Sequence, residues 1–378
     1  MRPASEIERR RLNDTFARLC AIPSPFGSER ACAEAVAGDL ASMGIDVEED
    51  GAAAAVGAQC GNLLARIPGR SERSILLCAH LDTVPGDGVI EPVVVDGGWE
   101  SAGDTILGAD NKAAVAVLLE LARRCAVEGS PVDVELLFTV SEENALAGAK
   151  AFDVSSLRSE WGYVFDHASP IGEIVVAAPT YYRFDADFRG TPTHAGIRPE
   201  EGRSAIEAAA RAVSAMRLGR IDEQTTANVG SIRGGQSGGT NIVAERCLVV
   251  GETRSLDPAR AEAMVAELIA HIHDAANTPA CACDVDVSTA RLFDGYRHPP
   301  SAPSVLAAEA ALRACGYEPA RRSTGGGSDA NAFEAAGFRC TNLANGTEHN
   351  HQPDERVSVA ALEGMLDVAF ALLDACSG

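Results

Sequence analysis

The sequence has no apolar run long enough to cross a membrane. A membrane-spanning helix needs about 20 consecutive, mostly apolar residues, and no stretch of the 378 residues approaches that length. The first residues, MRPASEIERRRLNDTFARLC, predict a charged amphipathic helix and do not resemble the apolar segment of a signal peptide. We therefore expect a cytoplasmic protein with no membrane partner.

Positive charge is also scarce. The chain has 32 lysines and arginines against 54 aspartates and glutamates, which gives a formal net charge of −22. An acidic surface repels phosphate backbones and anionic lipid headgroups. This charge balance argues against nucleic acid as a partner.

Several motifs of other enzyme classes are missing. The 11 cysteines are scattered and include no CxxC pair, as expected of buried thiols in a reducing compartment. No GxGxxG or GxxxxGK[ST] pattern occurs, and no GxSxG pattern stands at a predicted strand-to-helix turn. These absences argue against a nucleotide-binding enzyme and against a serine hydrolase with a nucleophile elbow.

What the sequence does contain is an alternation of apolar strands and amphipathic helices. Helices are expected at residues 5–20, 29–44 and 113–125, and strands at NLLARI, SILLCAH, VDVELLFTVS and WGYVFD. Such alternation is typical of a mostly parallel α/β sheet. From about residue 180 to 294 the expected order becomes β-α-β-β-α-β, starting within a long strand segment at 172–190, and this order is typical of a ferredoxin-like α+β domain. The smaller domain is therefore predicted to be inserted into the larger one.

Imidazoles and carboxylates gather where predicted strands end or helices begin. Ligands of open α/β sheets bind beyond the carboxyl ends of the strands. A single polar residue there is more often a capping or hydrogen-bonded group, but histidines and carboxylates together suit zinc and related ions. One carboxylate can bridge two ions about 3.5–4 Å apart. The residues in question are His80, Asp82, Asp110, Glu142, Glu143, Asp166 and His351.

Seven motifs follow one another along nearly the whole chain: HLDTVPG, GADNKAAVAVLL, TVSEENALAGAKA, GTPTHAGIRPEEGRSAI, GGTNIVAE, ETRSL and GGGSDANAF. Together they resemble the M20 metallopeptidases, and most of all the peptidase T-like, tripeptidase-type branch. Any one motif would be weak, whereas HxD, GADNK and SEE in this order are specific. The resemblance implies a di-zinc hydrolase that cleaves peptide bonds.

The resemblance also implies a role for each ligand. His80 and Asp166 would bind one zinc ion, Asp110 would bridge both ions, and Glu143 and His351 would bind the second. Manganese or cobalt could replace zinc in such a site.

Two further residues would act beside the ions. Asp82 would orient His80 through its other ring nitrogen, and Glu142 would be the general base on the bridging water. His349 lies two residues from His351 and stays an alternative ligand.

For the inserted domain the resemblance implies a lid and a dimerisation surface. His194, in GTPTHAG, would enter the active site of the other subunit of a homodimer and stabilise the oxyanion. Asn241 and Arg254 would contact substrate, with Arg254 suited to a peptide carboxylate. The expected fold is thus a mixed, mostly parallel catalytic domain, residues 1–179 and 295–378, with a ferredoxin-like lid and dimerisation domain at 180–294.

The preferred function is an aminopeptidase that acts on small peptides, tripeptides above all. The same ligands would equally serve an N-acyl-amino-acid amidohydrolase or a carboxypeptidase, because specificity lies in the shape of the pocket. A non-catalytic binding protein on this fold is a further alternative, and loss of Glu142 would have favoured it. The acidic group that an aminopeptidase needs near the free amine of its substrate has no assigned residue.

Overall fold

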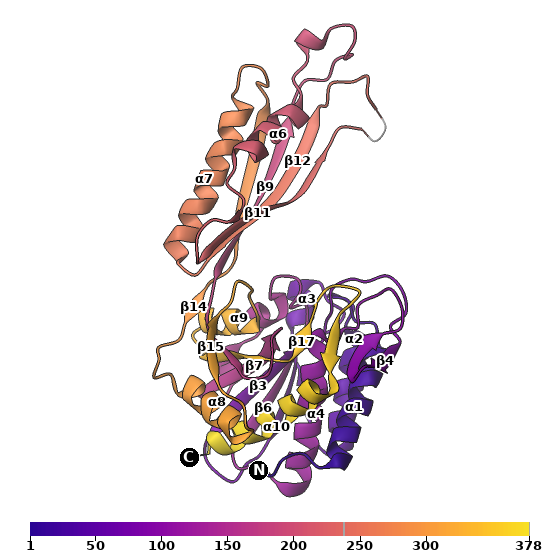
Figure 1. Ribbon diagram of the computed structural model, residues 1–378, viewed down its shortest axis with the longest axis vertical. Helices are drawn as coiled ribbons and strands as arrows, with labels where there is room; N and C mark the ends of the chain where they lie inside the picture. Colours follow the sequence, from indigo (N-terminus) through magenta and orange to yellow (C-terminus); the bar gives the residue numbers. More distant parts are fainter. Residues whose placement is uncertain (237–238, 378) are drawn as a thin grey trace. The chain divides into compact units, whose positions relative to one another are not determined.

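A computed structural model describes residues 1–236 and 239–377 of the chain. The chain forms two compact units, which are Met1–Ala177 together with Arg297–Gly378, and Ala178–Tyr296 (Figure 1). Each unit has its own hydrophobic core. The second unit is therefore an insertion in the sequence of the first.

The first unit contains a mixed sheet whose central strands are parallel. Strands β6, β3, β7 and β16 lie side by side in this order and are parallel to one another. Strand β2 is antiparallel to both of its neighbours, β1 and β6. The predicted mixed, mostly parallel sheet is confirmed. Its strand order is β1 (Val47–Glu49), β2 (Leu63–Ile67), β6 (Asp133–Thr139), β3 (Ser74–His80), β7 (Trp161–His167), β16 (Cys340–Ala344), β8 (Glu173–Ala178) and β14 (Tyr296–Arg297), with β15 (Ala320–Ser323) paired to β8.

Helices pack against this sheet and against one another. They are α1 (Glu6–Cys20), α2 (Arg30–Ser42), α3 (Ala52–Val56), α4 (Ala109–Glu128), α5 (Ala147–Ala151), α8 (Pro303–Ala314), α9 (Asp329–Ala335) and α10 (Val359–Ala375), with a 3-10 turn at Val154–Ser156. Helix α4 contacts β3, α1 and α10, while α9 contacts β16 and α5. In the part of the chain that the structure describes, no helix has the length and apolar character that a membrane span requires.

Strand β3 and helix α4 lie at the centre of the core. All seven residues of β3 are buried, as expected for a strand that is covered on both faces and reads as a continuous apolar run. Most of α4 is buried as well, from Ala109 to Cys125. His80 ends the buried strand with only 1% of its surface exposed, so its ring lies in a dry environment.

A second, smaller sheet in the first unit is not predicted by the sequence pattern. It has the order β17 (Thr347–Glu348), β18 (Arg356–Ser358), β5 (Gly98–Ser101) and β4 (Pro92–Val95). Asp96 and Gly97 join β4 to β5 with φ of 47° and 74°, as a type I′ hairpin turn requires. The dipeptide Asp96-Gly97 after Val93–Val95 was the signal for this hairpin. The loop that joins β17 to β18 carries His351.

The second unit has the predicted β-α-β-β-α-β order, with one additional two-residue strand after its first helix. Its antiparallel sheet runs β10 (Gly219–Arg220), β11 (Thr225–Gly234), β12 (Arg246–Ser255), β9 (Thr180–Arg189) and β13 (Asp284–Phe293). Helices α6 (Ala205–Ala215) and α7 (Pro258–Ala276) pack on it and on each other, and a 3-10 turn covers Pro199–Glu201. The long strand segment expected at 172–190 is in fact two strands, β8 and β9, in different sheets. Pro179 separates them because it has no N–H for a ladder.

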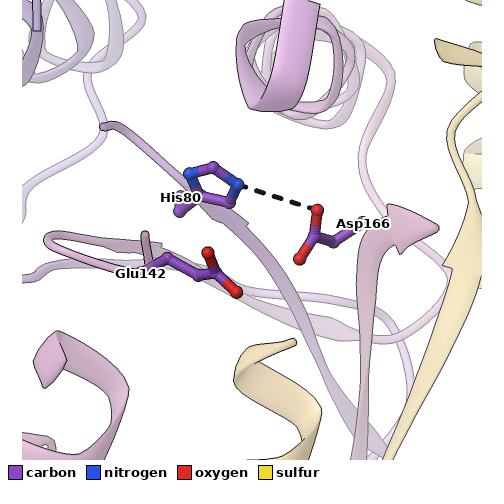
Figure 2. A group of neighbouring side chains, drawn as sticks. All are labelled: His80, Glu142 and Asp166. Carbon is purple, nitrogen blue, oxygen red and sulfur yellow. Dashed lines mark ion pairs between the residues drawn. The ribbon is translucent and has the colours of Figure 1, made fainter. Parts of the chain in front are cut away.

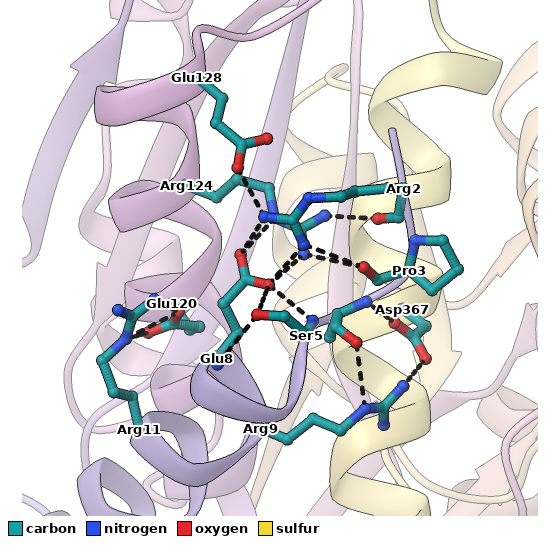
Figure 3. Close-up of polar contacts among 11 residues, drawn as sticks. Arg2, Pro3, Ser5, Glu8, Arg9, Arg11, Glu120, Arg124, Glu128 and Asp367 are labelled. Carbon is teal, nitrogen blue, oxygen red and sulfur yellow. Dashed lines mark hydrogen bonds and ion pairs between the residues drawn. The ribbon is translucent and has the colours of Figure 1, made fainter.

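Buried charges attach the N-terminal segment to α4. Arg124 donates to both carboxylate oxygens of Glu8, at 2.7 and 2.8 Å, and to the carbonyl oxygen of Arg2 (Figure 3). Its guanidinium carbon lies 3.3 Å from the centre of the Phe370 ring. Burial raises the pKa of Glu8, but hydrogen bonds from Arg124, Arg2 and Ser5 outweigh it and hold that pKa well below its ordinary value. Glu8 is therefore a buried carboxylate that depends on its cationic partners.

Replacement of Arg124 by methionine should lower the free energy of unfolding of the first unit by about 3 kcal/mol. Removal of one partner of a buried ion pair is costly because the other charge is left uncompensated. We expect the lower end of that cost here because Arg2 stays beside Glu8. Urea unfolding followed by circular dichroism measures the loss.

Arg123→Met is the matched control on the same helix. Arg123 is partly exposed and pairs with Glu120 at 3.4 Å, so its loss should cost about 1 kcal/mol or less. A carboxylate whose pKa is lowered in the folded protein stabilises the fold fully only above its ordinary pKa, which is 4.5 for glutamate, and this stabilisation is lost as the pH falls below that value. The difference between wild type and Arg124→Met should therefore shrink at pH 3, and equal losses from the two variants at pH 7 would contradict this role of Arg124.

Candidate metal centre

Three adjacent strands bring polar side chains to one edge of the first unit's sheet. Strand β3 lies between β6 and β7 and is parallel to both. Its last residue, His80, is paired in register with Thr139, the last residue of β6. Glu142 and Glu143 follow the end of β6 after two residues, and Asp166 is the penultimate residue of β7. The carboxyl ends of parallel strands meet at the same edge, which is where open α/β sheets bind ligands.

Two sets of three side chains meet around His80. Ligand atoms of His80, Glu142 and Asp166 lie within 4.8 Å of one another, and so do those of His80, Asp110 and Glu143. Figure 2 shows the first set, with the imidazole and both carboxylates turned toward a common point. Nε2 of His80 is 3.7 Å from Oδ1 of Asp166 and 3.3 Å from Oδ1 of Asp110. The fold thus brings residues from three strand ends and from the start of α4 into one buried cluster.

His351 reaches this cluster, whereas His349 does not. Nε2 of His351 is 2.7 Å from Oε1 of Glu143 and 3.3 Å from Oδ2 of Asp110. Nδ1 of His349 instead lies 2.6 Å from Asp354, and its side chain is 55% exposed. Of the two histidines that the sequence left as alternatives, His351 has the geometry of a ligand.

The cluster concentrates negative charge among largely buried carboxylates, with His351, whose side chain is 47% exposed, on its solvent side. Burial raises the pKa of Glu142 well above its ordinary value, and the charge of Asp166 adds to this shift; burial and the charge of Asp110 do the same to Asp166. Burial also acts on Asp110, but contacts with His351 and His80 outweigh it and lower the pKa of Asp110. Contacts with carboxylates raise the pKa of His351 to about 10. The four carboxylates Asp110, Glu142, Glu143 and Asp166 outnumber the two imidazoles, His80 and His351, so negative charge is in excess in this group.

The donor set fits a divalent cation. Oε1 of Glu143 is buried and accepts no hydrogen bond from the described residues, although Nε2 of His351 is 2.7 Å away. The two atoms form an ion pair when His351 is protonated, and a cation could bind to both in place of that proton. Imidazole nitrogen and carboxylate oxygen are also the ligands that zinc takes in proteins.

The turn that carries Glu142 and Glu143 is held by side chains from other parts of the chain. Four consecutive backbone N–H groups each donate to a buried side chain: Val140 to Asn62 (3.1 Å), Ser141 to Glu29 (3.1 Å), Glu142 to Asp82 (3.0 Å) and Glu143 to Asp82 (2.9 Å). Glu29 and Asn62 are not among the site residues that the sequence predicts. Glu29 stands at the start of a helix after a turn, where a carboxylate is common, so its contact with Ser141 has no local signal.

Asp82 has a role beyond the one expected for it. Nδ1 of His80 lies 3.0 Å from the backbone oxygen of Asp82 and 3.5 Å from its carboxylate oxygen Oδ1. The closer contacts of the carboxylate are with the N–H groups of Glu142 and Glu143. Asp82 therefore holds the turn after β6 and lies beside the ring of His80 at the same time.

The remaining predicted site residues lie in the second unit. Ala195 N donates to Asn241 O at 2.9 Å, so the segments of His194 and Asn241 lie side by side. Nδ1 of exposed His194 accepts from Gly196 N at 3.2 Å, which in a neutral ring leaves the proton on Nε2.

Arg254, also in the second unit, is paired within its own strand. Its Nε lies 3.0 Å from Oε1 of Glu252, and its guanidinium stacks 4.3 Å from the ring centre of Tyr181. A substrate carboxylate at Arg254 would therefore compete with Glu252.

Comparisons with known proteins agree with one another. The model of peptidase family M20/M25/M40 matches residues 76–375. The YqjE protein of Bacillus subtilis is 35% identical over 371 residues, which are 97% of this chain and 99% of that protein.

Two solved structures match in fold and in sequence. An aminopeptidase PepT from Bacillus cereus has 34% identity and a TM-score of 0.86, with 98% of this chain and 99% of that one covered. A tripeptidase from Staphylococcus aureus has 32% identity and a TM-score of 0.91, with 98% of each chain covered.

His351→Ala should reduce the number of bound divalent ions from two per chain to one, because it removes the imidazole that contacts Asp110 and Glu143. His349→Ala is the matched control and should keep both ions, since His349 is exposed and pairs with Asp354. Titration of metal-free protein with Zn²⁺ in a calorimeter measures both. Loss of an ion from the His349 variant alone would reverse the assignment.

Proposed function

The chain belongs to peptidase family M20/M25/M40 and is a peptide-bond hydrolase, and on that premise we propose that it is a di-zinc aminopeptidase acting on short peptides, above all tripeptides. The observation that carries the proposal is the pair of three-residue sets that share His80. The tripeptide substrate is supported by the full-length similarity to the B. cereus aminopeptidase and the S. aureus tripeptidase.

Contacts in the cluster support the proposed ligand assignment. His80 and Asp166 would hold one ion, Glu143 and His351 the other, and Asp110 both, since its two carboxylate oxygens face His80 and His351 separately. When bound, the two ions supply Lewis-acid polarisation of the substrate carbonyl and lower the pKa of the attacking water. Zinc is preferred for its affinity for imidazole and carboxylate, with manganese or cobalt as substitutes.

Glu142 is the proposed proton carrier. It lies against His80 and Asp166, and Asp82 fixes its backbone N–H. Glu142 takes the proton of the attacking water and passes it to the nitrogen of the leaving amine. The N–H of adjacent Glu143 donates to the same Asp82. The two glutamates thus lie on one turn held by Asp82, and we assign them different roles.

The second unit is proposed to act as lid and dimerisation domain, with residues 1–179 and 295–378 as the catalytic domain. His194 of one subunit would donate its Nε2 proton to the oxyanion formed in the other subunit. Asn241, beside His194, and Arg254 would contact the peptide. A cytoplasmic location is supported by the cysteines, which are free and, apart from half-buried Cys315, buried in the structure.

Glu142→Gln should lower kcat for a tripeptide by a factor of about 10² to 10⁴, the usual contribution of a general base, and should keep both metal ions. Glu348→Gln, at an exposed residue of β17 in the smaller sheet, is the control and should be active. Initial rates with alanine tripeptide, alanine dipeptide and N-acetyl-alanine measure the effect and the specificity together. Cleavage of N-acetyl-alanine alone would instead establish the amidohydrolase alternative.

Mixing two inactive variants tests whether His194 acts across a dimer. If it does, a hybrid of Glu142→Gln and His194→Ala subunits has one intact site, built from the unmutated Glu142 of one chain and the unmutated His194 of the other. An equal mixture, after subunit exchange, should then recover about a quarter of wild-type activity, since half the dimers are hybrids with one site each. Tripeptidase assays before and after mixing measure the recovery, and no recovery in a mixture shown to contain hybrids would place His194 in its own subunit's site.

A further inference from the structure

Glu355 makes an arrangement of contacts that the proposed mechanism does not use. It lies four residues after His351 and is 2% exposed. Its Oε2 accepts the backbone N–H groups of Leu107 and Gly108, at 2.9 and 2.8 Å, and its Oε1 accepts that of Asp110 at 2.9 Å. One carboxylate thus binds the backbone of the segment that leads into α4.

The backbone of this segment is shaped to receive an anion. Gly108 has a φ of 73°, in the left-handed region, and a Cβ there would lie 3.2 Å from Cγ2 of Thr83. The left-handed residue turns successive N–H groups toward one point, which makes a concave site for an anion. Glu355 fills that site, so its two oxygens are committed to backbone N–H groups and are not free to bind a cation.

The same side chain joins two loops that carry proposed ligands. Asp110 belongs to the segment that Glu355 holds, and His351 belongs to the loop from which Glu355 projects. Asn350 of that loop donates to Oδ2 of Asp110 at 2.7 Å, which adds a contact between the two loops. The third ligand of the second ion, Glu143, is held separately through Asp82.

We propose that Glu355 is a positioning residue that fixes Asp110 against the loop of His351 and thereby sets the affinity of the second metal ion. This inference rests on the proposed di-metal function. Without the full set of three hydrogen bonds, Asp110 and His351 would move relative to each other, while His80 and Asp166 would stay in place on β3 and β7.

Glu355→Gln tests this directly. An amide has one carbonyl oxygen, so its NH₂ group must face at least one of the three backbone N–H groups. The dissociation constant of the second Zn²⁺, measured by calorimetry on metal-free protein, should rise about 10- to 100-fold, as for other residues that orient ligands. The first ion shares Asp110 but keeps His80 and Asp166, so it should be weakened less than the second, and hydrogen exchange should become faster at the amides of 107–110.

Two further variants separate positioning from charge and from general stability. Glu355→Asp keeps the charge but is one methylene shorter, so it cannot reach all three N–H groups and should also weaken the second ion by about tenfold or more. Glu135→Gln is the matched control, because Glu135 is 1% exposed and accepts the N–H groups of Arg158 and Ser159 near the other end of β6. It should lower stability and leave both ions bound as in the wild type.

The outcomes are distinguishable. Wild-type affinity for both ions in Glu355→Gln would overturn the inference, and so would wild-type affinity in Glu355→Asp, since charge alone would then suffice. An equal loss in Glu135→Gln would overturn it by pointing to general destabilisation. A wild-type protein that binds fewer than two ions would overturn the proposed function and this inference with it.

Discussion

The first unit depends on the burial of several carboxylates beside two imidazoles at one edge of its sheet. Isolated charges are costly in a dry environment unless an opposite charge or hydrogen bonds accompany them. Strand β3, buried along its whole length, ends in this environment at His80. Cations that bind there would balance the charge of Asp110, Glu143 and Asp166, and the ligand geometry follows from that requirement.

A second consequence is that further buried carboxylates hold the backbone around the cluster. Asp82 and Glu29 accept N–H groups of the turn after β6, and Glu355 accepts those of residues 107, 108 and 110, where α4 begins. The backbone that carries the cluster is therefore held by carboxylates other than the proposed metal ligands, in addition to the contacts that His80 and His351 make with Asp110 and Glu143. This arrangement separates the groups that bind ions from the groups that position them.

The sequence predicts those parts of the molecule that local patterns determine. The apolar run of β3 followed by His80, the acidic pair after β6 and the β-α-β-β-α-β order are all visible within short windows, and motif order predicts the family. The distant side chains that accept backbone N–H groups around the site are not visible in this way. Glu29 lies 112 residues from Ser141, and Glu355 lies 247 residues from Gly108, so neither pairing has a periodicity or a spacing to reveal it. The pairing of β18 with β5 was missed for the same reason, because β18 comes from the far end of the chain, whereas the hairpin of β4 and β5 had a local signal in Asp96-Gly97.

The central claim is that two divalent ions share Asp110 at this edge of the sheet. Anomalous diffraction from crystals of the protein grown with zinc tests it most directly. The account predicts two peaks about 3.5–4 Å apart, one beside His80 and Asp166 and the other beside Glu143 and His351, with Asp110 between them. A single peak, or none with the carboxylates bonded to one another, would contradict it.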